Sequence, residues 1–122
     1  MNPDEQNNSP QEEWLDALDA VVAAPEHHRV LLETERVRVL DTLIKPGDET
    51  PVHTHRRSSV NYVLSASDFI RFDAAGNVVF DSRAAQVDLK TGTALSSPPL
   101  APHSVRNVGD SEIHVISVEL KD

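Results

Sequence analysis

Two of the six histidines in this chain stand close enough along the sequence to share one metal ion. His53 and His55 are separated by a single residue. On a β-strand, side chains two positions apart point to the same face, so both imidazole rings can reach one ion. On a helix this spacing would not bring the rings together. The pair alone is also consistent with surface or structural histidines.

Glycine, proline and asparagine residues stand at fixed distances from the histidines. Gly47 precedes His53 by six positions, which gives the pattern Gly-x5-His-x-His. A second pattern, Gly-x5-Pro-x4-His-x3-Asn, is formed by Gly92, Pro98, His103 and Asn107. In these patterns the chain resembles the cupin superfamily, whose motifs are Gly-x5-His-x-His-x3or4-Glu-x6-Gly and Gly-x5-Pro-x-Gly-x2-His-x3-Asn. The resemblance extends over about residues 37–120.

The resemblance implies a fold, a metal site and an assembly. Cupins are described as double-stranded β-helix barrels, often dimeric, whose two motifs lie on facing strands. The expected fold is therefore an all-β jelly-roll barrel, and the expected assembly is a homodimer. His53, His55 and His103 are expected to converge on one divalent metal ion. The other motif positions are expected to serve the structure: Gly47, Gly92, Pro98 and Asn107.

The chain departs from the family pattern because the glutamate of the first motif is missing. A gap of three residues places Ser59 at that position and Ala66 at the later glycine. A gap of four residues places Val60 and Ser67 there instead. We prefer the first alignment, because it places residues 62–64 where family members tend to have a similar aromatic and aliphatic run.

The missing carboxylate has a chemical consequence for the expected metal. Three neutral imidazoles leave the ion with its full double charge, which makes it a stronger Lewis acid toward water or an oxygen-rich ligand. A six-coordinate ion would keep about three positions open for substrate. Members of the family with three histidines include thiol and diketone dioxygenases. The donor set favours Fe(II) or Ni, with Zn close behind; the alternative is a site that has lost its metal.

Strand alternation predicts a lining for the pocket. If Ser59 faces inward, Asn61 and Val63 face inward as well. The amide of Asn61 would then contact a ligand, or would bond a neighbouring backbone group instead. Arg56 and Arg57 follow the histidine pair in a turn, where they are solvated or draw an anionic substrate toward the barrel mouth.

The remaining histidines lie outside both motifs. Within residues 113–120 the more apolar face carries His114, and we expect this face to point inward. His114 would then line the pocket, as a fourth ligand or as a hydrogen-bonded core histidine. His27 and His28 are expected to be exposed and to have no ligand role.

Short extended segments must position these residues. Alternating or β-branched runs bounded by turn residues predict an antiparallel sandwich or barrel, with residues 73–77 as a hairpin loop. The expected strands are residues 37–44, 59–64, 68–72, 78–80, 86–89, 94–96, 103–108 and 113–120.

A short N-terminal α-helix is expected to precede the barrel. Residues 9–12 (Ser-Pro-Gln-Glu) are typical of a capped helix start, and apolar residues then recur at helical spacing. The expected organisation is a disordered tail over residues 1–9, a helix over residues 10–24 and the barrel domain over residues 25–122.

Composition limits the partners. The 122 residues include no cysteine, which rules out zinc–thiolate sites and disulfides. A net charge of −9, from 20 acidic and 11 basic residues, argues against nucleic acid and anionic membranes as partners. With no apolar run of membrane-spanning length and no secretory signal, we expect a cytoplasmic protein.

Two functions remain open at this point. The first is a metal-dependent enzyme of the dioxygenase, isomerase or lyase class acting on a small organic molecule. No catalytic side chain is evident, apart from an unliganded His114 as a general base. The second is a non-catalytic cupin that binds a small ligand.

Overall fold

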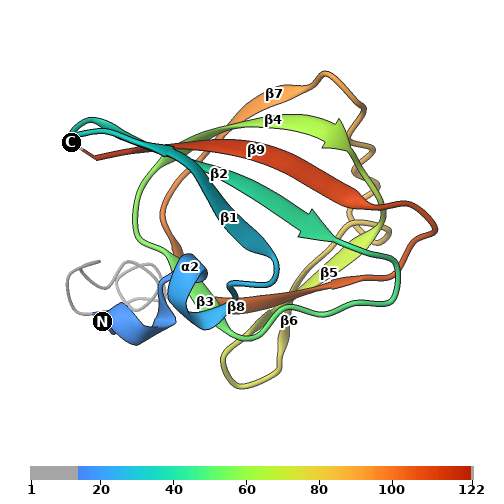
Figure 1. Ribbon diagram of the computed structural model, residues 1–122. Coiled ribbons are helices and arrows are strands. Elements are labelled where there is room, and N and C mark those ends of the chain that lie inside the picture. Colours follow the sequence, from blue (N-terminus) through green and yellow to red (C-terminus); the bar gives the residue numbers. More distant parts are fainter. Residues whose placement is uncertain (1–13, 122) are drawn as a thin grey trace.

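The computed structural model describes residues 14–121, which form two antiparallel β-sheets packed into a barrel (Figure 1). This confirms the expected all-β double-stranded β-helix. The strands are β1 (His28–Glu33), β2 (Val37–Ile44), β3 (His53–His55), β4 (Ser59–Ser65), β5 (Phe69–Asp73), β6 (Val78–Asp81), β7 (Ala94–Ser97), β8 (Leu100–Asn107) and β9 (Ile113–Leu120).

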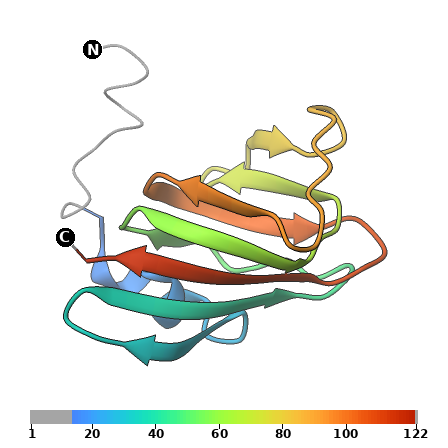
Figure 2. The same ribbon diagram turned by 90° about the horizontal axis from the view of Figure 1, so that it is seen from above.

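The strand order brings distant parts of the chain together. One sheet has the order β1-β2-β9-β4-β7 and the other has the order β3-β8-β5-β6. In Figure 2 the β1–β2 hairpin lies at one side of the molecule and the β5–β6 hairpin at the other. Strand β3 pairs with β8, and this pairing places His53 opposite His103. The histidines of the two motifs therefore meet through one strand pair.

The expected strands are observed except over residues 86–89, and the observed strands β1 and β3 were not among them. Residues 37–44 and 113–120 are β2 and β9, which pair in register along their whole length. The expected strand over residues 86–89 is wrong, because no sheet ladder forms there. Gln86 instead adopts a φ of 55°, which closes a turn and ends the extended run.

The N-terminal helix is shorter and more broken than expected. The described part of residues 10–24 contains a 3-10 turn, η2 (Asp16–Leu18), and a single α-helical turn, α2 (Ala20–Ala23). Asp19 between them is extended, with φ −54° and ψ 139°. Its carboxylate accepts hydrogen bonds of 2.9 and 3.1 Å from Arg38. A continuous helix is therefore wrong here, because this ion pair and a backbone bridge from Asp19 to β3 hold the chain extended.

The tail expected over residues 1–9 lies outside the described residues. The start of the expected helix, up to residue 13, lies outside them as well. In the part of the chain from residue 14 to residue 121, no helix is both long and apolar enough to cross a bilayer.

Asn107 ties together the turns at one end of the barrel. Its side chain is fully buried, and Nδ2 donates to the carbonyl oxygens of Ile44 (2.9 Å) and Ser111 (2.8 Å). Its Oδ1 accepts from the backbone N–H of Gly109 at 3.0 Å. The N–H of Gly47, whose φ is +82°, donates to the Asn107 carbonyl. The first and second motifs are thus joined by hydrogen bonds as well as by strand pairing.

Candidate metal centre

Four histidine rings meet inside the barrel. His28 comes from the start of β1, His53 and His55 come from β3, and His103 comes from β8. The ring centroids of His53 and His103 are 4.4 Å apart, and those of His53 and His55 are 5.0 Å apart. His28 lies 4.7 Å from His53 and 5.3 Å from His55. All four rings line one cavity of about 200 Å³.

Burial keeps the rings of His28, His53 and His103 neutral. His53 is 1% exposed, and His28 and His103 are each 4% exposed. Burial, reinforced by the neighbouring imidazoles, lowers the pKa of His28 to about 3, of His53 to about 4 and of His103 to about 2. The rings are therefore uncharged at neutral pH, which is the form of histidine that binds a metal ion.

Backbone carbonyl groups fix which nitrogen of each buried ring is free. Nδ1 of His28 donates to the carbonyl of Ala24 at 3.1 Å. In His53 and His103 the acceptor is the carbonyl two residues earlier, at 2.8 and 2.7 Å. In a neutral ring the other nitrogen, Nε2, then carries the lone pair. Within residues 14–121 no protein atom hydrogen-bonds these three Nε2 atoms.

Glu119 on β9 supplies a carboxylate that the sequence analysis missed. It is 1% exposed, and its Oε1 accepts a 2.6 Å hydrogen bond from Nε of Arg38. Its Oε2 lies 3.5 Å from Nδ1 of His55 and has no hydrogen-bond partner among the described residues. The sequence signal was a single acidic residue inside the largely apolar strand of residues 113–120.

Glu119 is held in its charged form. Burial raises the pKa of Glu119, but the neighbouring His55 ring and the Arg38 guanidinium lower it by more, so its pKa lies below the usual value. Arg38 also binds Asp19, so its guanidinium connects two carboxylates. The free oxygen of Glu119 can therefore accept a hydrogen bond from Nδ1–H of His55, which leaves Nε2 of that ring for the cavity.

The donor set fits a transition-metal ion. The donor nitrogens of His28, His53 and His55 all lie within 4.8 Å of one another. Two nitrogens bound to one ion at about 2.1 Å can be at most about 4.2 Å apart. The three rings would therefore need to move only slightly closer together to bind one ion. His103 stands outside this tightest group, although its ring is beside that of His53.

The expectation that His27 and His28 are exposed is wrong. Both rings are buried. Nε2 of His27 bonds Oδ2 of Asp48 at 2.8 Å. His28 begins β1 opposite Thr42 of β2, whose side chain lines the cavity. Pairing with the inward face of β2 therefore turns His28 into the barrel, and no local pattern in the sequence signals this.

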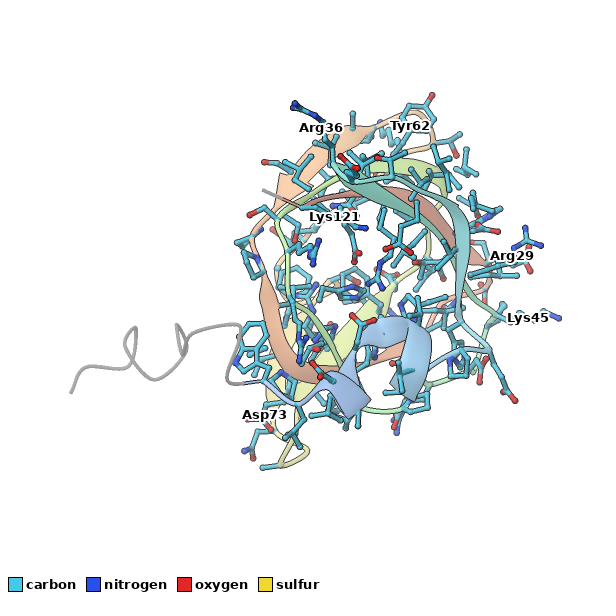
Figure 3. All side chains as sticks on the ribbon, turned by 60° about the vertical axis from the view of Figure 1, so that its left-hand side comes forward. Arg29, Arg36, Lys45, Tyr62, Asp73 and Lys121 are labelled. Atoms are coloured by element: carbon cyan, nitrogen blue, oxygen red, sulfur yellow. The ribbon has the colours of Figure 1, made fainter. Side chains whose placement is uncertain are left out.

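Strand β4 lines the cavity with alternate residues. Ser59, Asn61 and Val63 all face the cavity, and Tyr62 points away from the barrel (Figure 3). Oδ1 of Asn61 accepts a 2.6 Å hydrogen bond from Oγ of Ser117. Nδ2 of Asn61 lies 3.2 Å from Oγ of Ser59. The amide is thus oriented by side chains rather than by a backbone group, and it presents a polar edge to the cavity.

The expectation that His114 lines the pocket is wrong. Its Nε2 bonds Oδ1 of Asp41 at 2.5 Å, on the outer face of the five-stranded sheet. The opposite face of β9 turns inward because Ser117 and Glu119 find their polar partners inside the barrel. The inward residues of β9 are Ile113, Val115, Ser117 and Glu119.

Comparisons with known proteins identify the family to which this chain belongs. The family model for the cupin domain matches residues 40–119, and the chain therefore belongs to the cupin family. No protein of curated function matched the chain.

Solved structures similar to this chain include several cupins. A cupin domain from Bordetella pertussis Tohama I has 25% identity and a TM-score of 0.62, with 78% of this chain and 92% of that chain covered. An RmlC-like cupin from Methanocaldococcus jannaschii has 13% identity and a TM-score of 0.54, covering 76% and 77%. The polyketide cyclase RemF from Streptomyces resistomycificus has 20% identity and a TM-score of 0.52, covering 78% and 64%. The last two support the fold alone.

Proposed function

We propose that this cupin binds one divalent transition-metal ion through His53, His55 and His103. The observation that carries the proposal is the orientation of the buried rings. Backbone carbonyls hold Nδ1 of His53 and His103, so each ring presents Nε2 to the same cavity as His55. Buried imidazoles without a partner for the free nitrogen are costly, and a bound ion would supply that partner.

The ion is expected to be Fe, Ni or Zn. Neutral imidazole suits these metals, whereas Mg and Ca prefer oxygen ligands. When bound, the ion would act as a Lewis acid toward an oxygen atom of a ligand. The chain's own contribution is a wall of aliphatic side chains and a polar edge formed by Ser59 and Asn61. These groups would orient a small organic molecule and exclude water.

We favour an enzyme of the dioxygenase, isomerase or lyase class acting on such a molecule. The cavity of about 200 Å³ is smaller than pockets that hold drug-sized ligands, which favours a small substrate. The alternative is a cupin that binds a small ligand without converting it. A shortage of acid–base groups in the cavity favours this alternative. Among the described residues that line the cavity, Arg71 is the one ionisable residue besides the histidines and Glu119.

The test begins with metal content. The full chain, purified without a histidine tag, is stripped with a chelator and reloaded with Fe(II), Ni(II) or Zn(II). We expect about one ion per chain for the wild type and loss of binding for His53→Ala. Oxygen consumption on addition of thiols or diketones would support the enzyme. Ligand-induced thermal stabilisation without turnover would support the binding protein.

We also propose that the chain forms a homodimer through the outer face of the five-stranded sheet. Val39, Val118 and Val60 stand opposite one another in a row across three strands of this face. Val60 is 47% exposed and Tyr62 is 48% exposed. Light scattering after size-exclusion chromatography should give a dimer for the wild type and a monomer for Val60→Lys. A monomeric wild type would contradict this assembly.

A further inference from the structure

His28 lies outside both histidine motifs and outside residues 40–119, the region that matches the cupin family. Even so, its ring is part of the cluster inside the barrel. We infer that His28 is a fourth imidazole ligand of the metal ion. This inference rests on the metal site proposed above and adds a ligand to it.

The position of the donor atom supports this role. The donor nitrogens of His28, His53 and His55 lie within 4.8 Å of one another, a closer group than the one that includes His103. Among the ring contacts of the described residues, the pair His28 and His103 is missing, while both rings contact His53 and His55. His28 and His103 are therefore farther from each other than either is from His53 and His55, and an ion bound by both would lie between them.

The hydrogen bonding of His28 also differs from that of an ordinary core histidine. Its Nδ1 is used by the carbonyl of Ala24, so its Nε2 is the free nitrogen. The ring is 4% exposed, and in the described part of the chain no protein group bonds Nε2. The neighbouring His27 has the opposite arrangement, because its Nε2 is taken by Asp48. A bound ion would supply a partner for the one nitrogen of His28 that the protein leaves without one.

The N-terminal segment holds His28 in place. Helix α2 contacts both β1 and β3, the strands that carry three of the four histidines (Figure 1). Ala24, the residue that binds His28, directly follows α2. Ahead of α2, Asp19 is fixed by Arg38 and by a bridge to Thr54 of β3. The metal would thus connect the N-terminal segment to the barrel wall.

A fourth imidazole changes what the site can accept. A six-coordinate ion would keep about two open positions rather than about three. Two adjacent positions accept one bidentate anionic oxygen ligand, or one monodentate ligand and a water molecule. Four neutral nitrogen donors also favour late transition metals such as Ni, Cu and Zn over Mn and Mg.

A cysteine placed at position 28 tests the inference directly, because the chain has no cysteine of its own. The full-length His28→Cys variant is loaded with Co(II), and the absorption spectrum is recorded. A thiolate bound to cobalt gives an intense near-ultraviolet charge-transfer band. We expect this band for His28→Cys and its absence for the matched control His27→Cys, whose side chain faces Asp48.

X-ray absorption on the Zn(II)-loaded wild type gives an independent readout that does not depend on any variant folding. We expect four imidazoles in the wild type and in His27→Gln, and three in His28→Gln. The Zn(II) affinity of His28→Gln should fall by more than about 100-fold, beyond the 10–100-fold loss typical of outer-shell partners. Bound cobalt without the thiolate band, together with three imidazoles in the wild type, would overturn the role of His28 and leave the proposed metal site intact. A wild type that binds neither Zn(II) nor Co(II) would overturn both.

Discussion

The Oε2 atom of Glu119 lies 3.5 Å from Nδ1 of His55, although the two residues are 64 positions apart in the sequence. The other carboxylate oxygen of Glu119 is held by Arg38 at 2.6 Å. The motif glutamate that is usual in cupins is missing from this chain, and a carboxylate from a different strand stands beside one of the motif histidines. Its position suits a partner that orients His55 rather than a direct metal ligand.

Replacing Glu119 by Gln should weaken metal binding. The negative charge of Glu119 orients the His55 ring and raises the basicity of that ring, and the variant loses this charge. The affinity for Zn(II) should therefore fall by about 10–100-fold. A competition titration with a chromophoric chelator measures the change. Glu49→Gln is the matched control, because Glu49 pairs with Arg106 on the surface. Unchanged affinity in a folded Glu119→Gln protein would contradict the orienting role.

The metal-free protein should lose stability in mild acid. The unfolded chain takes up protons on His28, His53 and His103 as the pH falls below the ordinary histidine pKa of 6.5, while burial keeps the folded rings neutral to about pH 4 or lower. Above about pH 7 these three rings should leave the free energy of unfolding unchanged. As the pH is lowered from about 6.5 to 4, the free energy of unfolding should fall. Each ring contributes about 1.4 kcal/mol per pH unit within that window.

Urea unfolding of the chelator-treated protein at about pH 7.5, 6 and 5 checks this dependence. Glu119 acts in the same direction at lower pH, because its lowered pKa makes the unfolded chain bind its proton first. A urea midpoint that stays constant from about pH 7.5 to 5 would show that the rings are already solvated in the folded protein.

Asn107→Leu should destabilise the fold strongly without touching the metal ligands. The substitution removes the donor for two carbonyl oxygens and the acceptor for the N–H of Gly109, all at the turn that joins the motifs. The expected loss is about 3 kcal/mol of unfolding free energy, since buried partners are left unsatisfied. Chemical denaturation measures it, with Asn77→Leu in the exposed β5–β6 loop as the control, expected to change stability much less.

His114→Gln should leave metal binding unchanged. The ring bonds Asp41 on the outer face of the sheet, away from the cavity. The number of ions bound per chain and their affinity should match those of the wild type, whereas His103→Gln should reduce both. Loss of metal from His114→Gln would mean that β9 presents its other face to the interior.

Local patterns in the sequence were sufficient for the fold and for part of the site. The turn-forming Gly47 and the spacing of His53, His55 and His103 are short-range signals, and the strand pairing of β3 with β8 brings these histidines together as the family resemblance implied. The shared orientation of His53 and His55 could be predicted because alternation along a strand determines which side chains share a face.

The missed features depend on contacts between distant strands. His28 turns inward because β1 pairs with β2, and β9 turns its less apolar face inward, against the local pattern. The inward face is selected by the pairing of Glu119 with Arg38. The expected helix over residues 10–24 breaks at Asp19 for a related reason, because Arg38 binds its carboxylate. A long-range ion pair outweighs a local helical pattern in this case.

An anomalous difference map from crystals of the Zn(II)-reloaded wild-type protein, collected on both sides of the zinc absorption edge, tests the central claim most directly. We predict one strong peak per chain within about 2.3 Å of the Nε2 atoms of His53, His55 and His103. A map without a peak in the barrel, from protein shown to be folded and exposed to excess Zn(II), would contradict the metal site on which the proposed function depends.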